Sequence, residues 1–298
     1  MHITLEPEIT SGNDVLSVKG LSKSYEHKLF SNIDFQIKRG EKVALIGNNG
    51  TGKTTILKII NGIVDADAGE IKLGSNVEIG YYDQEHQLLH MEKTIFEEIS
   101  DAYPGLNNTK IRNVLAAFLF TNDDVFKRIS DLSGGERGRV SLAKLMLSDA
   151  NFLILDEPTT GLDPQTRLLI WNVIERLRTE ENMTVFLTTH YMEEAASAGY
   201  VVIIDKGSIV AEGTTLELKN EYVHDTISLY GVTEDEIKAL KTEYKAIRDG
   251  YRIQVKNTLE ATKMIVKHQE IFRDYEVVKG GMDDVFLAVT GKILGGGQ

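Results

Sequence analysis

The sequence predicts an α/β fold built around a mostly parallel β-sheet, and three observations indicate it. Apolar strand-like runs alternate with helix-length segments over residues 152–213. Residues 42–47 form a continuous apolar run without alternation, which is typical of a strand buried on both faces. A glycine-rich turn follows this run directly and leads into a helical pattern. Because crossover helices join parallel strands, this order favours one largely parallel sheet.

The expected elements follow from the apolar periodicity. Near the N-terminus, strands are expected at 15–21, 33–37 and 42–46. Residues 94–129 have a strandless helical pattern, with apolar residues at Ile111, Val114, Leu115, Phe118 and Leu119. The elements expected after this region are helices at 135–147, at 164–178 and from 191, and strands at 152–155, 184–189, 201–205 and 208–213.

A smaller second unit is expected after residue 220, where the strand–helix pattern restarts. Thr233 and Glu236 have the spacing of a capping box at the start of a helix. No catalytic constellation is visible in this part. The predicted organisation is a large domain at 1–220 with a helical subdomain at about 94–147, a small α+β accessory or dimerisation domain at 221–292, and a flexible tail at 293–298.

Composition and charge limit the classes of protein. The 298 residues are 42% hydrophobic and 26% charged, which is ordinary for a soluble globular protein. No apolar stretch approaches the roughly 20 residues that a membrane span needs, and the first residues are not typical of a secretory signal. The net charge of -12 argues against a broad surface for nucleic acid or anionic lipid. Without cysteine, thiolate metal sites are excluded.

The turn after residues 42–46 carries a phosphate-binding motif. The residues G-N-N-G-T-G-K-T fit the spacing GxxxxGK[ST] between a strand and a helix. Backbone N–H groups at such a helix start hold phosphates, and Lys53 would reach the β- and γ-phosphates while Thr54 binds Mg²⁺. The alternative is a glycine turn with a surface lysine, which the complete motif disfavours. The predicted nucleotide-binding residues are Gly47, Asn48, Asn49, Gly50, Thr51, Gly52, Lys53, Thr54 and Thr55.

Two adjacent acids end the expected strand at 152–155. Taken alone, Asp156 and Glu157 are most simply solvated acids at a strand end. Beside a triphosphate site, Asp156 would instead bind Mg²⁺ through water, and Glu157 would polarise a water for attack on the γ-phosphate. The two motifs together therefore predict metal-dependent hydrolysis of a nucleoside triphosphate.

A third motif connects the chain to a known family. Leu132-Ser133-Gly134-Gly135-Glu136 precedes the helix that leads to Asp156. Locally it is an N-cap serine with a glycine turn, but its place between the other two motifs resembles the signature of ABC ATPases. The resemblance covers residues 14 to about 220. It implies a P-loop NTPase cassette with an antiparallel β subdomain and a helical subdomain, and two cassettes paired head to tail. Ser133 and Gly135 would then act in the partner's ATP site.

Four further residues match motifs of this family. Tyr25 matches the aromatic residue that stacks on adenine, with a surface tyrosine as the alternative. Gln84 matches the Q-loop glutamine near Mg²⁺ and the attacking water, with an unremarkable loop glutamine as the alternative. Asp163 matches the D-loop aspartate that signals between sites. His190 matches the switch histidine at the γ-phosphate, with a structural histidine as the alternative.

The resemblance implies ATP and Mg²⁺ as ligands of one composite site. The residues that it implies as catalytic are Glu157, His190, Gln84 and Lys53, and those near the metal are Thr54, Gln84 and Asp156.

Two parts of the chain resemble different branches of the family. Residues 7–155 resemble the second cassette of ABC-F proteins, which are soluble and act on ribosomes. That branch normally continues as DEPTNHLD, whereas this chain continues as DEPTTGLDP. Residues 156–292 resemble the ATP-binding subunits of multidrug-type ABC exporters. We therefore expect a chimera joined near DEPT, which a natural homologue with one subfamily pattern on both sides would exclude.

Three functions are compatible with the resemblance. The first is an ATP hydrolase that acts as a homodimer and serves an exporter with a separate membrane subunit, which would place it in the cytoplasm, at the inner face of the membrane. The second is an ABC-F-like ribosome-associated translation factor, against which stand the single cassette and the acidic charge. No direct contact with nucleic acid is expected. The third is an ATP-binding scaffold with weak or uncoupled hydrolysis.

Overall fold

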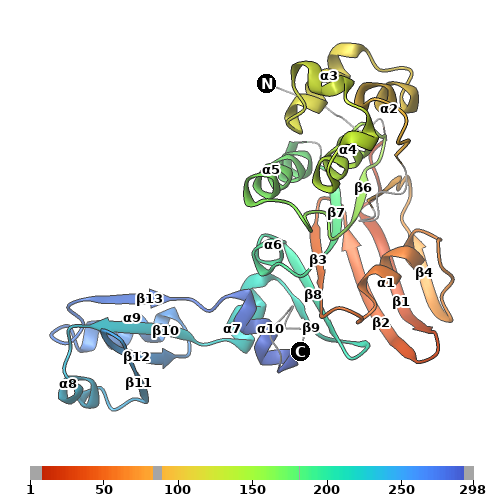
Figure 1. Ribbon diagram of the computed structural model, residues 1–298. Helices are drawn as coiled ribbons and strands as arrows, with labels where there is room; N and C mark the ends of the chain where they lie inside the picture. Colours follow the sequence, from red (N-terminus) through yellow and green to blue (C-terminus); the bar gives the residue numbers. More distant parts are fainter. Residues whose placement is uncertain (1–8, 83–88, 181, 292–298) are drawn as a thin grey trace.

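The computed structural model describes residues 9–82, 89–180 and 182–291 (Figure 1). Its central element is a six-stranded sheet with the order β5-β6-β7-β3-β8-β9. The first five strands in this order pair in parallel, and β9 is antiparallel to β8. The predicted α/β class with a mostly parallel core is confirmed. The strands are β3 (Lys42–Ile46), β5 (Ile79–Tyr82), β6 (Phe152–Asp156), β7 (Thr184–Thr189), β8 (Tyr200–Asp205) and β9 (Ser208–Gly213).

Both faces of this sheet are covered, which explains the continuous apolar runs in its strands. Val43 and Leu45 of β3 belong to one hydrophobic cluster, and Ala44 and Ile46 belong to the other. Successive side chains of a strand point to opposite faces, so a strand between two apolar layers shows no polar alternation. The first cluster includes residues of the helix α1 (Lys53–Ile60). The second cluster includes, among other helices, α4 (Gly134–Met146) and α5 (Pro164–Glu180).

A three-stranded antiparallel sheet with the order β2-β1-β4 packs into the first cluster. Its strands are β1 (Asp14–Ser24), β2 (Lys28–Lys38) and β4 (Ala68–Leu73). The sequence patterns predicted neither β4 nor β5. Every residue of β4 is exposed or half-buried, so the strand has no apolar face that alternation could reveal, and β5 is only four residues long.

The predicted helical region is present. Apart from one isolated bridge between Thr94 and Arg128, residues 94–129 form helices and turns. Four of its five predicted apolar residues are buried, but Leu119 is exposed because α3 ends at Ala117 and Leu119 has a φ of 65°. The helical elements before α4 are α2 (Ile95–Ala102), α3 (Asn108–Ala117), η1 (Asn122–Phe126) and η2 (Ile129–Asp131). In the part of the chain that the structure describes, no helix has both the length and the apolar character needed to cross a membrane.

The C-terminal part contains a separate four-stranded antiparallel sheet with the order β11-β12-β10-β13. Its elements follow the order βαββαβ, a recurrent split-βαβ arrangement, and they enclose their own hydrophobic cluster. This sheet lies apart from the large domain (Figure 1). The capping box that we predicted from Thr233 and Glu236 is confirmed at the start of α8. The elements are β10 (Asp225–Tyr230), α8 (Glu234–Ala239), β11 (Tyr244–Ile247), β12 (Gly250–Val255), α9 (Thr258–Lys267) and β13 (Tyr275–Val278).

The last helix leaves this sheet and returns to the large domain. α10 (Met282–Thr290) packs against α6 (Met192–Ala196) and α7 (Thr215–Tyr222), and Figure 1 shows it beside α7. Its residues Met282, Val285 and Phe286 are part of the largest hydrophobic cluster of the molecule. The segment predicted as an accessory domain at 221–292 therefore contains a self-contained sheet and a helix that contributes to the core of the large domain.

Phe286→Ala should destabilise the large domain. The Phe286 side chain is 1% exposed, and truncating a buried phenylalanine typically costs about 3–5 kcal/mol. Urea unfolding can be followed by the fluorescence of Trp171, the single tryptophan, which lies in α5 of the large domain. Leu287→Ala is the matched control, because Leu287 is on the same helix and 44% exposed. An unfolding midpoint that shifts equally in both variants would contradict the docking of α10 through Phe286.

Candidate functional site

The phosphate-binding motif forms the connection between β3 and α1. Gly50 and Gly52 have φ angles of 81° and 98°, a region in which other residues are strained. Gly47 is restricted by space instead, because a Cβ atom there would lie 2.5 Å from the carbonyl oxygen of Ile204 in β8. The loop therefore needs glycine at these positions, and its backbone is left free of side chains at Gly50 and Gly52.

The Lys53 side chain is buried within this loop. Its Nζ donates a hydrogen bond to the carbonyl oxygen of Gly47 at 2.8 Å and lies 3.4 Å from that of Asn48. It is also 3.8 Å from Oε1 of Glu157. Burial lowers the pKa of Lys53, and the carboxylates of Glu157 and Asp156 oppose this effect. The ammonium group thus lies where phosphate oxygens could replace the loop carbonyls as its partners.

Asp156 connects the end of β6 to the phosphate loop. It is buried, and its Oδ1 accepts hydrogen bonds from the Thr188 hydroxyl at 2.6 Å and the Thr54 hydroxyl at 3.2 Å. Carboxylate and hydroxyl oxygens suit Mg²⁺, which usually takes one or two protein carboxylates and completes its shell with water and substrate phosphate. Among the described residues, no cluster of three acidic or histidine side chains could hold a metal. The donor set therefore fits a Mg²⁺ that is bound together with phosphate.

Glu157 lies next to both Lys53 and His190. Its Oε2 is 3.2 Å from Nδ1 of His190 and accepts a hydrogen bond from the Thr160 hydroxyl at 3.2 Å. The backbone of Glu157 has a φ of 46°. A non-glycine residue in this region costs on the order of 1–3 kcal/mol, and such strain clusters at functional sites. Its N–H is held by the backbone carbonyl of Thr188 and by the Thr188 hydroxyl, at 3.2 and 3.1 Å.

Thr188 and Thr160 are site residues that the sequence patterns missed. Thr188 contacts both acids, and Thr160 contacts Glu157. Their only signal in the sequence is position, because one threonine lies two residues before His190 and the other lies three residues after Glu157. Threonine pairs at strand ends are too common to be singled out without the contacts.

The remaining predicted residues are spread over other parts of the molecule. Tyr25 is 62% exposed in the turn between β1 and β2, with Nζ of Lys23 5.5 Å from its ring centre. Asp163 accepts hydrogen bonds from the N–H groups of Gln165 and Thr166 at the start of α5. Hydrogen bonding to the Thr166 side chain, together with these N–H groups, lowers the pKa of its carboxyl. Gln84 lies outside the described residues.

The signature motif lies at the start of α4. Ser133 accepts a hydrogen bond from the N–H of Glu136, and the Glu136 carboxylate accepts one from the N–H of Ser133, which forms a capping box. These bonds lower the pKa of Glu136. Leu132 is buried, whereas Ser133 and Gly134 are exposed and Gly135 is half-buried. The local N-cap interpretation is therefore correct, and the exposed residues are also open to a second molecule.

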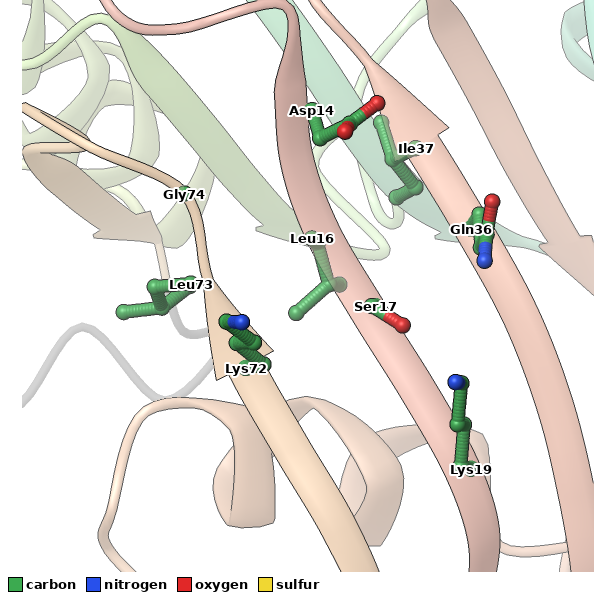
Figure 2. Close-up of a pocket in the computed structure, with 9 residues that line it drawn as sticks. All are labelled: Asp14, Leu16, Ser17, Lys19, Gln36, Ile37, Lys72, Leu73 and Gly74. Carbon is green, nitrogen blue, oxygen red and sulfur yellow. The ribbon is translucent and has the colours of Figure 1, made fainter.

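A hollow of about 240 Å³ lies outside this site, on the antiparallel sheet. It is lined by residues of β1, β2 and β4 and the adjoining Gly74, among them Asp14, Lys19 and Lys72 (Figure 2). None of the predicted site residues lines it, so it does not belong to the phosphate-loop site.

Comparisons with known proteins find relatives over most of the chain. The family model described as "ABC transporter" matches residues 30–160. The protein YdiF of Bacillus subtilis is 49% identical over 166 residues, which is 55% of this chain and 26% of YdiF. The Nod factor export ATP-binding protein I of Rhizobium etli is 32% identical over 302 residues, covering 91% of this chain and 92% of that protein.

A solved structure supports the fold alone. It is the dimeric, post-hydrolysis state of the ATP-binding cassette MJ0796 bound to ADP and Pi, with a TM-score of 0.60 and 23% identity. The match covers 67% of this chain and 98% of that one. The central sheet and phosphate loop described above thus belong to a known architecture.

Proposed function

Because the chain belongs to the ABC transporter family of ATP-binding proteins, we propose that it binds Mg-ATP and hydrolyses it. The observation that carries the proposal is the convergence of Lys53, Asp156, Glu157 and His190, which come from the phosphate loop and from the ends of β6 and β7. Members of this family generally hydrolyse ATP. Mg²⁺-dependent release of phosphate from ATP by the purified chain tests the proposal.

Each residue has a part in the proposed reaction. Lys53 and the loop N–H groups hold the β- and γ-phosphates. Thr54 and Asp156 would hold Mg²⁺, which neutralises phosphate charge when bound. Glu157 takes a proton from the attacking water, whose oxygen bonds to the γ-phosphorus as the bond to the bridging oxygen breaks. His190, beside Glu157, orients that carboxylate and contacts the γ-phosphate. ADP and phosphate are the products.

The complete site requires two copies of the chain. Ser133, which is exposed, and Gly135, which is half-buried, would bind the γ-phosphate held by the partner's phosphate loop, since backbone N–H groups at a helix start favour anions. The related cassette was solved as a dimer, and this supports the proposal. Within this scheme Tyr25 stacks on adenine and Asp163 signals between the sites.

Specific ATPase activity should rise with protein concentration and then reach a plateau. A composite site forms only in the dimer, so the active fraction follows the monomer–dimer equilibrium. The rate per chain is measured at saturating Mg-ATP over a 100-fold dilution series, with a carrier protein to prevent surface loss. A rate per chain that stays constant down to concentrations at which gel filtration finds only monomer would contradict a site shared between two copies.

We propose that the chain serves as the ATP-binding subunit of an exporter, at the cytoplasmic face of a separate membrane subunit. The supporting observation is the match to 92% of a protein named for export. An ABC-F-like ribosome factor is the second candidate, because residues 7–155 resemble that branch of the family. The match at 49% identity covers 55% of the chain. Sedimentation with ribosomes in ATP separates them: Glu157→Gln should co-sediment only if the second candidate holds.

The proposal of a chimeric origin rests on the different sequence patterns before and after DEPT, while the 32% match over 302 residues spans both parts. A chain assembled from two parents could bind ATP with weak hydrolysis. The turnover number of the intact dimer distinguishes this scaffold from an efficient ATPase.

A further inference from the structure

The Glu194 carboxylate is buried behind the site, on α6. Glu194 is 4% exposed, and its side chain accepts hydrogen bonds from three donors on separate segments. The Thr189 hydroxyl donates to Oε2 at 2.6 Å. The indole Nε1 of Trp171 in α5 donates to Oε1 at 2.8 Å, and the Thr159 hydroxyl donates to the same oxygen.

Burying a carboxylate is costly unless hydrogen bonds or charges compensate it. Three donors provide most of that compensation here. Lys42 adds positive charge nearby, with its Nζ 4.5 Å from the centre of the Trp171 ring and bonded to the Ser197 hydroxyl at 2.8 Å. Burial lowers the pKa of Lys42, and the charges of Glu175 and Glu194 oppose this. Keeping the Glu194 carboxylate buried still costs free energy, so we look to its hydrogen-bond partners for a role.

Two of those partners are next to the proposed reacting groups. Thr159 lies two residues after Glu157, and Thr189 lies directly before His190. The Thr189 hydroxyl also accepts the N–H of Tyr191 at 2.9 Å, which holds the chain on the other side of the histidine. Glu194 thus anchors the loop after β6 and the last residue of β7, and these segments lead to Glu157 and His190.

We infer that Glu194 is a positioning residue, which fixes the contact between Glu157 and His190 by binding the segments that lead to them. The inference rests on the proposed ATPase function. Glu194 itself touches neither reacting group among its hydrogen-bond partners. Its loss should therefore lower the rate of the chemical step and leave nucleotide binding by the phosphate loop unchanged.

Glu194→Gln tests this directly. An amide keeps the size of the side chain but accepts hydrogen bonds at one end only. The threonine hydroxyl at the other end must then accept from the amide, and the charge-assisted bonds that hold the two segments are lost. We expect kcat to fall by about 10- to 100-fold, the effect of a small misplacement of catalytic groups, with an unchanged Kd for ATP. Glu193→Gln is the matched control, because Glu193 is the exposed neighbour on the same helix. The Trp171 emission maximum should move in the first variant only.

A second pair of variants removes one bond without touching the carboxylate. Thr189→Val keeps the shape of the side chain and deletes the hydroxyl, and Thr189→Ser keeps the hydroxyl. We expect a fall in kcat for the valine variant and near wild-type kcat for the serine variant. If Glu194→Gln fails to fold, this pair of variants still tests whether the hydrogen bond between Thr189 and Glu194 supports catalysis.

Several outcomes would overturn the positioning role. One is a kcat within twofold of wild type in both Glu194→Gln and Thr189→Val. Another is a loss of activity that only matches the loss of folded protein in circular dichroism and thermal unfolding. A wild-type chain without ATPase activity would instead overturn the proposed function and this role with it, so the two failures are distinguishable.

Discussion

Glu157→Gln should lower the kcat of ATP hydrolysis by about 10²- to 10⁴-fold, the usual contribution of a general base. The substitution keeps the size of the side chain but removes the group that would take the proton from water. The backbone N–H bonds to Thr188 do not depend on the carboxylate, so the loop should keep its conformation. Steady-state phosphate release at saturating Mg-ATP measures the effect.

The same variant should accumulate an ATP-bound dimer. If hydrolysis is what separates the two copies, slowing it leaves ATP bridging the phosphate loop of one copy and Ser133 of the other. Gel filtration in saturating Mg-ATP measures the dimer fraction, with Glu193→Gln as the control, because Glu193 is an exposed carboxylate. A Glu157→Gln chain that stays monomeric would remove the basis for placing Ser133 in the partner's site.

Lys53→Ala should abolish hydrolysis by weakening the binding of the triphosphate. The ammonium group is the buried cation of the loop, and in P-loop proteins this lysine contacts the β- and γ-phosphates. We expect at least a tenfold rise in the Kd for ATP, which corresponds to about 1.4 kcal/mol, and a loss of kcat of about 10²-fold or more, because phosphate positioning carries much of the rate. Calorimetric titration with ATP measures the binding part.

Lys58→Ala is the matched control for this variant. Lys58 lies in the last turn of the same helix, away from the loop, so its removal should change neither Kd nor kcat by more than about twofold. Thermal unfolding of both variants separates lost binding from lost structure. Wild-type affinity for ATP in a folded Lys53→Ala chain would refute the assignment of Lys53 to the phosphates.

The parts of the site that the sequence predicted are short and local. The phosphate loop is a continuous segment in which Gly50 and Gly52 have a local backbone reason, their positive φ; Gly47 differs, because its constraint comes from Ile204 in β8. The capping boxes at Ser133 and Thr233 are local in the same way, since both partners lie within three residues. Interactions of this range are encoded in neighbouring residues, so a motif is sufficient to predict them.

Contacts between distant segments were not predictable in this way. Thr188 reaches Asp156 from 32 residues along the chain, and Thr159 reaches Glu194 from 35. Each of these residues is unremarkable in its own segment. The strand β4 was missed for a related reason: it is held by its pairing with β1, and its own side chains are exposed or half-buried.

By itself, the sequence determined the α/β class, the phosphate loop and the family. These depend on apolar periodicity and on motifs in which the reacting groups and their backbone support are close neighbours. Only the tertiary structure decided that Thr188 contacts both acids of the site, that Glu194 is buried, and that α10 returns to the large domain. Those features arise from packing between segments that are far apart in the chain. Burial of apolar surface between the segments stabilises this packing, and no local sequence pattern shows which segments will pack together.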